Sequence, residues 1–319
     1  MKAWSKRDGA LRLVDVPVPE PGTDELLVRV QATSLNRGEA RTVARAAEGT
    51  VPGWDVAGTV ERAARNGKGA PKGARVSAFV SGGAWAEFVC IPAAQAAIVP
   101  DAVDLEVAAT LPIAGLTVLR AFEIAGSILG RSLLVTGGSG GVGQIAIQLG
   151  TSAGAVVTAI SSRDSQRDAL RKLGAHDVVP TIDAAKGPFD LILESVGGAS
   201  LATAIDRVAR GGVIVTIGNS SEEETTFNAR TLYAKGGATI YGLLIFEEVG
   251  SRRVRADHLE RLFALVEAGK LTPPIQVRKS WMELPSVLAG LERGAYAGKA
   301  VLTFDSFSLP AHPSRPALR

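Results

Sequence analysis

The spacing of hydrophobic residues divides the chain into a β-rich first part and a longer region in which strands and helices alternate. In roughly the first 100 residues, short runs alternate between apolar and polar positions, and Gly and Pro separate them. Alternation with a period of two is typical of a half-buried strand. Strands are predicted at Leu26–Ala32, Val56–Glu61, Ala74–Val80 and Trp85–Ile91. The pattern indicates a small barrel-like β domain.

From Asp104 onward, segments with helical periodicity stand between short apolar runs. Helices are predicted at Asp104–Leu111, Leu116–Ala125, Val142–Ala153, Ser165–Leu173 and Leu201–Val208. Strands are predicted at Ser132–Thr136, Val156–Ser161, Val178–Val179, Leu191–Glu194, Val213–Ile217 and Ala238–Ile245. This alternation favours a parallel, doubly wound sheet, and the short apolar strands suit burial on both faces.

The pattern changes again after about Phe246. Helices are predicted at His258–Gly269 and Leu284–Arg293, and strands at Ile275–Val277 and Lys299–Phe304. The tail from Ser306 contains several prolines and is expected to fray.

The composition suits a soluble chain with large buried cores. Its 319 residues, 46% of them hydrophobic, fit two domains of about 100–200 residues each. The formal net charge of +3 is spread along the chain, which does not indicate nucleic acid or an anionic membrane as a partner. Because no apolar run reaches about 18 residues, we expect a cytoplasmic protein with no membrane segment.

The sequence contains few residues of the kind that bind a zinc ion. Cys90 is the only cysteine, so an intrachain disulfide and a four-cysteine zinc site are both excluded. The three histidines, His176, His258 and His312, lack ligand spacing. A catalytic zinc normally has three protein ligands, and the first 125 residues offer only Cys90 and carboxylates. The sequence therefore predicts no functional metal.

A glycine-rich loop stands between a predicted strand and a predicted helix. Gly138, Gly140 and Gly143 satisfy the GxGxxG pattern of dinucleotide-binding folds. In that pattern the glycines permit a tight turn, a close approach to the pyrophosphate, and close packing of helix on strand. The helix N-terminus adds free N–H groups and partial positive charge. The predicted cofactor loop comprises Gly138, Ser139, Gly140, Gly141, Val142 and Gly143.

The end of the next strand points to the kind of dinucleotide. An NAD site usually has an acidic residue there, which binds the ribose 2′-hydroxyl. This chain has Ser161, Ser162 and Arg163 instead, and hydroxyls with a guanidinium suit a 2′-phosphate. The sequence favours NADPH as cofactor. The neighbouring Asp164 weakens the argument, and Arg163 could also be an ordinary solvated side chain.

Motifs spread over residues 2–304 carry a family resemblance. They are Ser34–Asn36, Pro52–Gly58, Gly83–Glu87, Leu111–Thr117, Leu173–Ala175, Glu194–Gly198 and Gly298–Leu302, together with the glycine loop. In this order they resemble the zinc-free quinone oxidoreductase and enoyl reductase branch of the medium-chain dehydrogenase/reductase superfamily. The resemblance implies an α/β fold with a GroES-like β-rich catalytic domain and a Rossmann domain. The catalytic domain would be split into residues 1–110 and 247–319, around a Rossmann NADPH-binding domain at residues 111–246.

The resemblance also implies site residues. Asn36 would lie at the nicotinamide and substrate pocket, and Thr117 near the nicotinamide ribose. Asn219 and the Leu243–Phe246 segment, with Leu244 and Phe246, would line the cofactor cleft. Asn36 could instead bond its own turn, and Thr117 a helix carbonyl. No Tyr, His, Cys or Lys lies between Asn36 and Pro52, so no proton donor is assigned.

The predicted reaction is hydride transfer from NADPH to a quinone or to an enone or enoyl C=C conjugated to a carbonyl. Asn36 would donate to the developing oxyanion, and Arg41 could bind an acidic or carrier-linked substrate. The alternatives are an NADPH-binding protein without turnover, and a carbonyl–alcohol oxidoreductase. A homodimer is also expected, because Ala238–Ile245 would leave an apolar strand edge that pairing covers.

Overall fold

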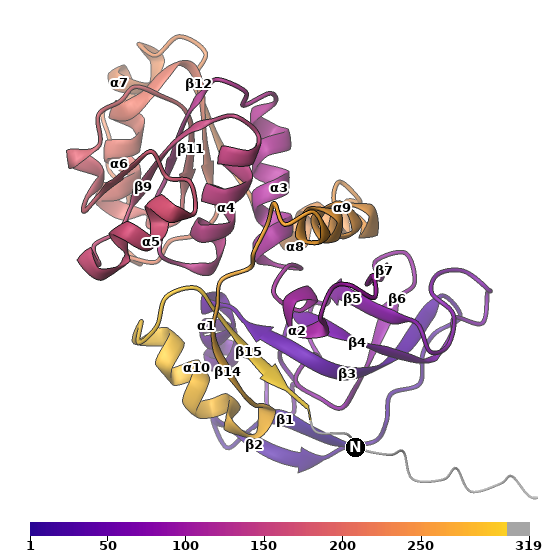
Figure 1. The fold of residues 1–319 in the computed structure, drawn as a ribbon. Helices are drawn as coiled ribbons and strands as arrows, with labels where there is room; N and C mark the ends of the chain where they lie inside the picture. The colour runs from indigo at the N-terminus through magenta and orange to yellow at the C-terminus, as the bar shows by residue number, and fades with distance from the viewer. Residues whose placement is uncertain (305–319) are drawn as a thin grey trace, which may run out of the picture.

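The computed structural model describes residues 1–304, which form two lobes, each built on its own sheet (Figure 1). One sheet has seven strands and the other six. The predicted fraying of the tail from Ser306 falls outside the described residues. The fold class expected from the sequence, a GroES-like domain with a Rossmann domain, is confirmed.

The seven-stranded sheet joins the two ends of the chain. Its order is β14-β15-β3-β4-β5-β7, with β6 paired to β3. Ala300 of β15 stands opposite Leu35 of β3, which places Lys299 beside the residues that follow β3. The strands are β3 (Glu25–Leu35), β4 (Asp55–Arg62), β5 (Arg75–Phe79), β6 (Phe88–Pro92), β7 (Ala97–Ile98), β14 (Ile275–Ser280) and β15 (Lys299–Thr303). A separate hairpin comprises β1 (Lys2–Arg7) and β2 (Ala10–Asp15).

The six-stranded sheet is parallel throughout and has the order β10-β9-β8-β11-β12-β13. This is the strand order of a Rossmann fold, whose ligands bind where the order reverses, here at the carboxyl ends of β8 and β11. The strands are β8 (Ser132–Val135), β9 (Val156–Ile160), β10 (Asp177–Val179), β11 (Phe189–Glu194), β12 (Val208–Thr216) and β13 (Thr239–Gly242).

Helices cover both faces of this sheet, as the apolar strand runs predicted. Leu133 and Val135 of β8 belong to one buried core, and Leu134 between them belongs to another. The helices of this lobe are α3 (Ala114–Ala125), α4 (Gly141–Ser152), α5 (Arg167–Lys172), α6 (Gly198–Arg207) and α7 (Ala229–Tyr233), with 3-10 turns at Asp164–Gln166 and Ile182–Ala184.

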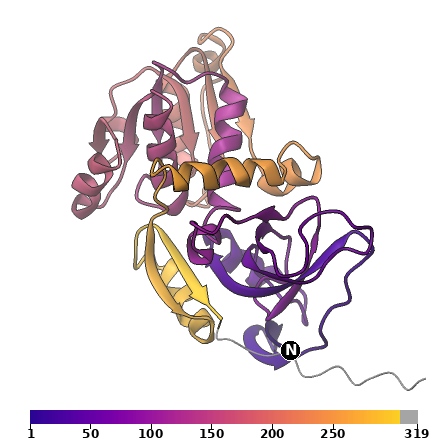
Figure 2. The same cartoon turned by 45° about the vertical axis from the view of Figure 1, so that its right-hand side comes forward.

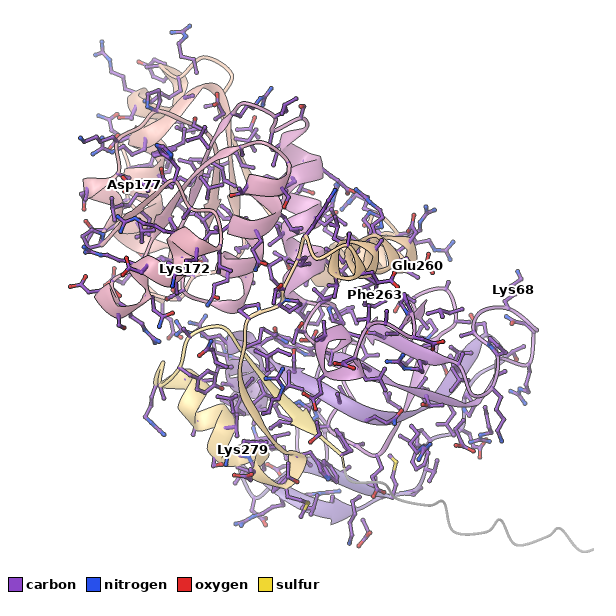
Figure 3. The ribbon with its side chains drawn as sticks, in the orientation of Figure 1. Lys68, Lys172, Asp177, Glu260, Phe263 and Lys279 are labelled. Atoms are coloured by element: carbon purple, nitrogen blue, oxygen red, sulfur yellow. The ribbon has the colours of Figure 1, made fainter. Side chains whose placement is uncertain are left out.

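The remaining helices belong to the other lobe and to the junction. They are α1 (Arg37–Arg45), α2 (Leu105–Ala108), α8 (Ile245–Gly250), α9 (Ala256–Glu267) and α10 (Leu284–Glu292), with a 3-10 turn at Trp281–Glu283. In Figure 2, α9 lies across the junction of the lobes. Its Phe263, labelled in Figure 3, is fully buried in a core that also contains Phe79 of β5 and Val135 of β8. A single apolar core therefore connects the lobes.

Several predicted elements differ from the structure. The strand at Ala238–Ile245 ends at Gly242, and α8 begins at Ile245. The helix at Asp104–Leu111 is the four-residue α2. The strand at Trp85–Ile91 begins only at Phe88, and the N–H of Trp85 donates to the carbonyl oxygen of the distant Pro52. The hairpin β1–β2 and the helices α1, α7 and α8 were not predicted from the sequence.

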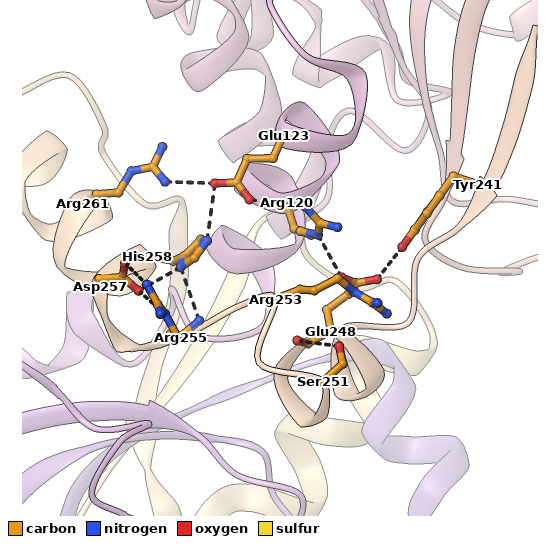
Figure 4. A network of polar contacts seen from close by, with 10 residues as sticks. All are labelled: Arg120, Glu123, Tyr241, Glu248, Ser251, Arg253, Arg255, Asp257, His258 and Arg261. Carbon is orange, nitrogen blue, oxygen red and sulfur yellow. Dashed lines mark hydrogen bonds and ion pairs between the residues drawn. The ribbon is translucent and has the colours of Figure 1, made fainter.

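A network of polar contacts explains why α8 forms after β13 (Figure 4). The buried carboxylate of Glu248 on α8 accepts hydrogen bonds from Arg120 Nε (2.8 Å), Arg253 Nε (2.8 Å) and Tyr241 Oη (2.6 Å). Burial alone would raise the pKa of Glu248, but these donors outweigh it and the pKa is lowered. Because Arg120 lies on α3 and Tyr241 on β13, tertiary contacts that no local pattern reveals hold α8.

Strand β13 is the outer strand of the parallel sheet. Large exposed apolar side chains lie near it in the sequence, Tyr233 before it and Leu244 after it. An open, partly apolar edge is the feature on which the expected homodimer rests, and the homodimer stays a prediction. Within residues 1–304, no helix is long and apolar enough to span a membrane.

Candidate active site

A buried cluster of charged and polar side chains forms where β3 ends, β4 begins and β15 begins. Lys299 Nζ donates to Asn36 Oδ1 (2.7 Å), Asp55 Oδ2 (3.2 Å) and the Leu35 carbonyl oxygen (3.1 Å). Asn36 Nδ2 donates to Asp55 Oδ2 (2.8 Å), which also accepts from Ser34 Oγ. Asp55 is fully buried and Lys299 is only 3% exposed, whereas Asn36 is half-buried. Asn36 is thus the member of this trio that reaches the surface.

The same cluster anchors the start of α3. Asp55 Oδ1 accepts a hydrogen bond from the backbone N–H of Ile113 (2.9 Å), directly before α3. Thr117 lies one turn further along this helix and is buried, and its N–H donates to the Ile113 carbonyl oxygen. Asp55 therefore fixes Asn36 and the helix that carries Thr117 relative to each other.

The glycine loop has the geometry that its pattern predicts. The N–H of Gly138 donates to the Ile160 carbonyl oxygen at the end of β9 (2.8 Å). A Cβ on Gly143 would lie 2.7 Å from the Cα of Gly138, closer than real Cβ contacts come, so only glycine lets α4 pack on the loop. Gly140 is the residue before α4, whose first N–H groups have no partner within the helix.

The glycine loop also touches the lobe built on the seven-stranded sheet. The N–H of Gly298 donates to the Ser139 carbonyl oxygen (2.9 Å), and Gly140 forms a bridge with Gly298. A Cβ on Gly141 would lie 2.6 Å from Cδ of Lys299. The aliphatic part of Lys299 therefore packs against the first residue of α4, while its ammonium holds Asn36. Lys299 therefore contacts both predicted features: its aliphatic part contacts the glycine loop, and its ammonium group bonds the amide of Asn36.

The strand end predicted to bind the ribose lies beside this loop. Ser161 follows β9 and is buried, Ser162 is exposed, and Arg163 is half-buried. Arg163 Nη2 donates to the Gly294 carbonyl oxygen, which belongs to the loop after α10. A Cβ at Gly294 would lie 3.1 Å from Nη2 of Arg163 and 3.9 Å from Nη2 of Arg37. Two guanidinium groups from different lobes therefore converge here, with no carboxylate partner among residues 1–304.

Arg41 of α1 and Asn219, which follows β12, form a contact between the two lobes. Arg41 Nη1 donates to the backbone oxygen of Asn219 (3.1 Å), and its Nε pairs with Glu222 Oε1 (2.7 Å). A shallow pocket of about 240 Å³ opens beside it, lined by Arg41, Thr42, Arg45 and Ala46. Because the carboxylate of Glu222 already pairs with Nε of Arg41, that part of the guanidinium is not available to a substrate. Binding of an acidic substrate by Arg41 stays a prediction.

The predicted Leu243–Phe246 segment connects β13 to α8. Leu244 is exposed, whereas Phe246 packs edge-on against Trp54 and Phe79, with ring centroids 4.9 and 4.8 Å apart. Because Trp54 directly precedes Asp55, Phe246 packs next to the start of β4, where the buried carboxylate of Asp55 lies. A role for Leu244 and Phe246 in cofactor binding stays a prediction.

Two protein-family models match separate parts of the chain. The model for an alcohol dehydrogenase GroES-like domain matches residues 22–101, and that for a zinc-binding dehydrogenase matches residues 141–262. A 2-methylene-furan-3-one reductase of Solanum lycopersicum is 28% identical, over 95% of this chain and 79% of its own length. The human NAD(P)H oxidoreductase RTN4IP1, mitochondrial, is 30% identical, over 78% of this chain and 69% of its own length.

A solved structure agrees with these relatives. The quinone oxidoreductase from Coxiella burnetii superposes with a TM-score of 0.83 at 26% identity, covering 95% of this chain and 99% of that protein. The chain belongs to the medium-chain dehydrogenase/reductase superfamily. Its relatives place it in the quinone oxidoreductase and enoyl reductase branch. It is therefore an oxidoreductase that uses a nicotinamide dinucleotide.

The site residues fit the dinucleotide of this superfamily. Gly143 lets α4 pack closely on the loop, and the start of α4 offers N–H groups and partial positive charge to a pyrophosphate. The strand end at Ser161 lies where the adenosine ribose binds in Rossmann folds. The residues do not fit a zinc centre, although one matching model is described as zinc-binding. Among residues 1–304, no three His, Cys, Asp or Glu side chains are placed to hold a metal ion.

Glu39 is a second buried acid next to the cluster. Its carboxylate is fully buried on α1 and accepts the backbone N–H groups of Asn36 (2.6 Å) and Trp54 (2.9 Å). Burial, and then the negative charge of Asp55, raise the pKa of Glu39 to about 8, although these two donors and Lys299 oppose the shift. The site therefore holds two carboxyl groups and one ammonium group, all buried, and Glu39 keeps its proton below a pH of about 8.

This raised pKa predicts a loss of stability with rising pH. Between the usual value of 4.5 and about 8, the folded protein keeps a proton on Glu39 that the unfolded chain has released. The free energy of unfolding should therefore fall as pH rises through that window and level off above it. Urea denaturation at pH values of about 6 and about 9 measures the fall. Glu39→Gln should remove most of it, and an unchanged fall in that variant would contradict the assignment.

Sequence reasoning missed Asp55, Lys299 and Glu39 as site residues. Asp55 and Lys299 each begin a strand whose first four residues are buried, which is a signal, because a charge at a buried position is normally paired. The sequence does not reveal the partner, since the two residues are 244 positions apart.

Proposed function

We propose that this protein reduces a quinone, or a C=C bond conjugated to a carbonyl, with NADPH as the hydride donor. Reduction of either substrate places negative charge on a carbonyl or quinone oxygen, and a hydrogen-bond donor near that oxygen lowers the barrier. When bound, the dinucleotide supplies the hydride; the protein must position both reactants and exclude water.

The observation that carries the proposal is the setting of Asn36. Its amide is half-buried and is linked through Lys299 to the first residue of α4, where the glycine loop ends. Nδ2 carries two hydrogens, and only one is used, toward Asp55. The second is free to bond a substrate oxygen. Asn36 is thus a donor at the edge of the cofactor cleft.

Two features support NADPH over NADH. The strand end after β9 carries Ser161, Ser162 and Arg163 and no carboxylate at the position that usually binds a ribose 2′-hydroxyl. The guanidinium of Arg163 uses one hydrogen toward Gly294 and keeps others for an anion. Hydrogen bonds between ionised groups are the strong ones, so a 2′-phosphate would gain from this site.

A substrate panel tests the proposal. Purified protein is supplied with NADPH and a series of quinones, enones, 2-enoyl thioesters, aldehydes and simple alcohols, and consumption of NADPH is followed by its absorbance. We expect turnover with quinones or enones and none with ethanol or benzyl alcohol. Cofactor binding without turnover across the panel would instead favour a binding protein. Efficient alcohol oxidation would favour a carbonyl–alcohol oxidoreductase.

A further inference from the structure

We infer that Lys299 and Asp55 are positioning residues, which fix the amide of Asn36 with an N–H group available to the substrate. The inference rests on the proposed function of Asn36 as donor to the substrate oxygen. It assigns to this buried ion pair a task toward the substrate, beyond its contacts with the start of α3 and with the glycine loop.

The two neighbours of the Asn36 amide have opposite hydrogen-bonding capacity. An ammonium can only donate, so Lys299 must bond Oδ1; an ionised carboxylate can only accept, so Asp55 must bond Nδ2. A flipped amide would place Nδ2 against the ammonium and Oδ1 against the carboxylate, losing both bonds. The pair therefore selects one of the two orientations that an isolated asparagine amide adopts about equally.

Neither charged residue is available to touch the substrate. All three hydrogens of Lys299 are directed at protein oxygens, those of Leu35, Asn36 and Asp55. Asp55 is fully buried and accepts from Ser34, Asn36, Lys299 and the N–H of Ile113. Any influence of the two charges on the substrate oxygen must therefore pass through Asn36, while Asp55 separately fixes the start of α3 through Ile113.

A buried ion pair is by itself weak evidence for a role in stability. Replacing both members of a buried ion pair with neutral groups of similar volume is often neutral or stabilising, whereas removing one member is strongly destabilising. The retention of a costly buried pair next to the half-exposed Asn36 fits a requirement for orientation. Asp55→Asn combined with Lys299→Met is therefore the informative variant, because it removes both charges and keeps the volume. If the new amide keeps its oxygen on the Ile113 N–H, its NH₂ group faces Asn36, which favours the flipped orientation.

The test is a double-mutant cycle with enone or quinone as substrate. The Asp55→Asn/Lys299→Met variant should lose about 100-fold in kcat, with a much smaller change in KM. Adding Asn36→Ala should cause little further loss, because the pair acts through that residue. A folded variant with near wild-type kcat, or losses that multiply in the combined variant, would overturn the inference.

A second measurement does not depend on activity. In ¹⁵N-labelled wild-type protein, the two side-chain NH₂ signals of Asn36, identified by their absence in Asn36→Ala, should be well separated, and the hydrogen bonded to Asp55 should exchange with water more slowly than the other. The milder variant Ser34→Ala, which removes one donor to Asp55, should shift these signals while the protein stays folded. Solvent-like Asn36 signals in the wild type would refute the inference. Failure of the wild type to reduce any quinone or enone would instead refute the proposed function alone.

Discussion

The Asn36→Ala variant is expected to lose about 100-fold in kcat while its affinity for NADPH changes little. Removal of one preorganised donor to a developing oxyanion costs on the order of 10²–10³ in kcat in enzymes where it has been tested. The side chain of Asn36 bonds Lys299 and Asp55, and within residues 1–304 it makes no hydrogen bond to the glycine loop, so the cofactor contacts should remain. Steady-state kinetics with an enone, and titration of NADPH by fluorescence, measure the two effects separately.

The control for this variant addresses local structure. Asn36 is also the residue that precedes α1, so its loss could act by loosening that helix. Asn228 precedes α7 and caps it by accepting the N–H of Arg230 (2.9 Å), in the lobe opposite α1 (Figure 1). Asn228→Ala should lower the melting temperature and leave kcat unchanged. Equal loss of kcat in both variants would show that stability, and not the amide of Asn36, accounts for the effect.

The sequence predicted the fold well because the strongest patterns were local. The parallel strands from Ser132 onward are short apolar runs, and their burial on two faces follows from the alternation of strands and helices. The hairpin β1–β2 and the helix α1 were missed because tertiary contacts stabilise them. Glu39 of α1, for example, bonds the backbone of Trp54. The late helix α8 depends in the same way on Arg120 of α3 and Tyr241 of β13.

The candidate site was predicted in part for a similar reason. The glycine loop is a contiguous motif, so Gly138, Gly140 and Gly143 could be found from their spacing alone. The cluster around Asn36 combines residues from three distant parts of the chain, and only the pairing of β15 with β3 brings Lys299 to Asn36. Glu222, likewise, is a partner of Arg41 that no spacing indicates.

Cofactor choice gives the second large expected effect, a preference for NADPH over NADH of roughly 10- to 100-fold. The estimate follows from one hydrogen bond to a charged group, which contributes about 1.5–3 kcal/mol, where about 1.4 kcal/mol is tenfold in affinity. Arg163→Ala should remove most of this preference and leave NADH binding nearly unchanged. Because the contact is ionic and Arg163 is only half-buried, higher salt should weaken NADPH binding more than NADH binding.

Arg167→Ala is the matched control for this prediction. Arg167 lies four positions further along the same segment, but its Nη2 already pairs with Asp164 Oδ1 (2.8 Å), so its loss should leave the cofactor ratio unchanged. Fluorescence titration of both cofactors into the wild type and the two variants decides the matter. Equal affinities in the wild type would exclude the preference altogether. If Arg163→Ala keeps the preference, another residue must bind the 2′-phosphate. Arg37 is then the next residue to substitute, because its guanidinium also lies near Gly294.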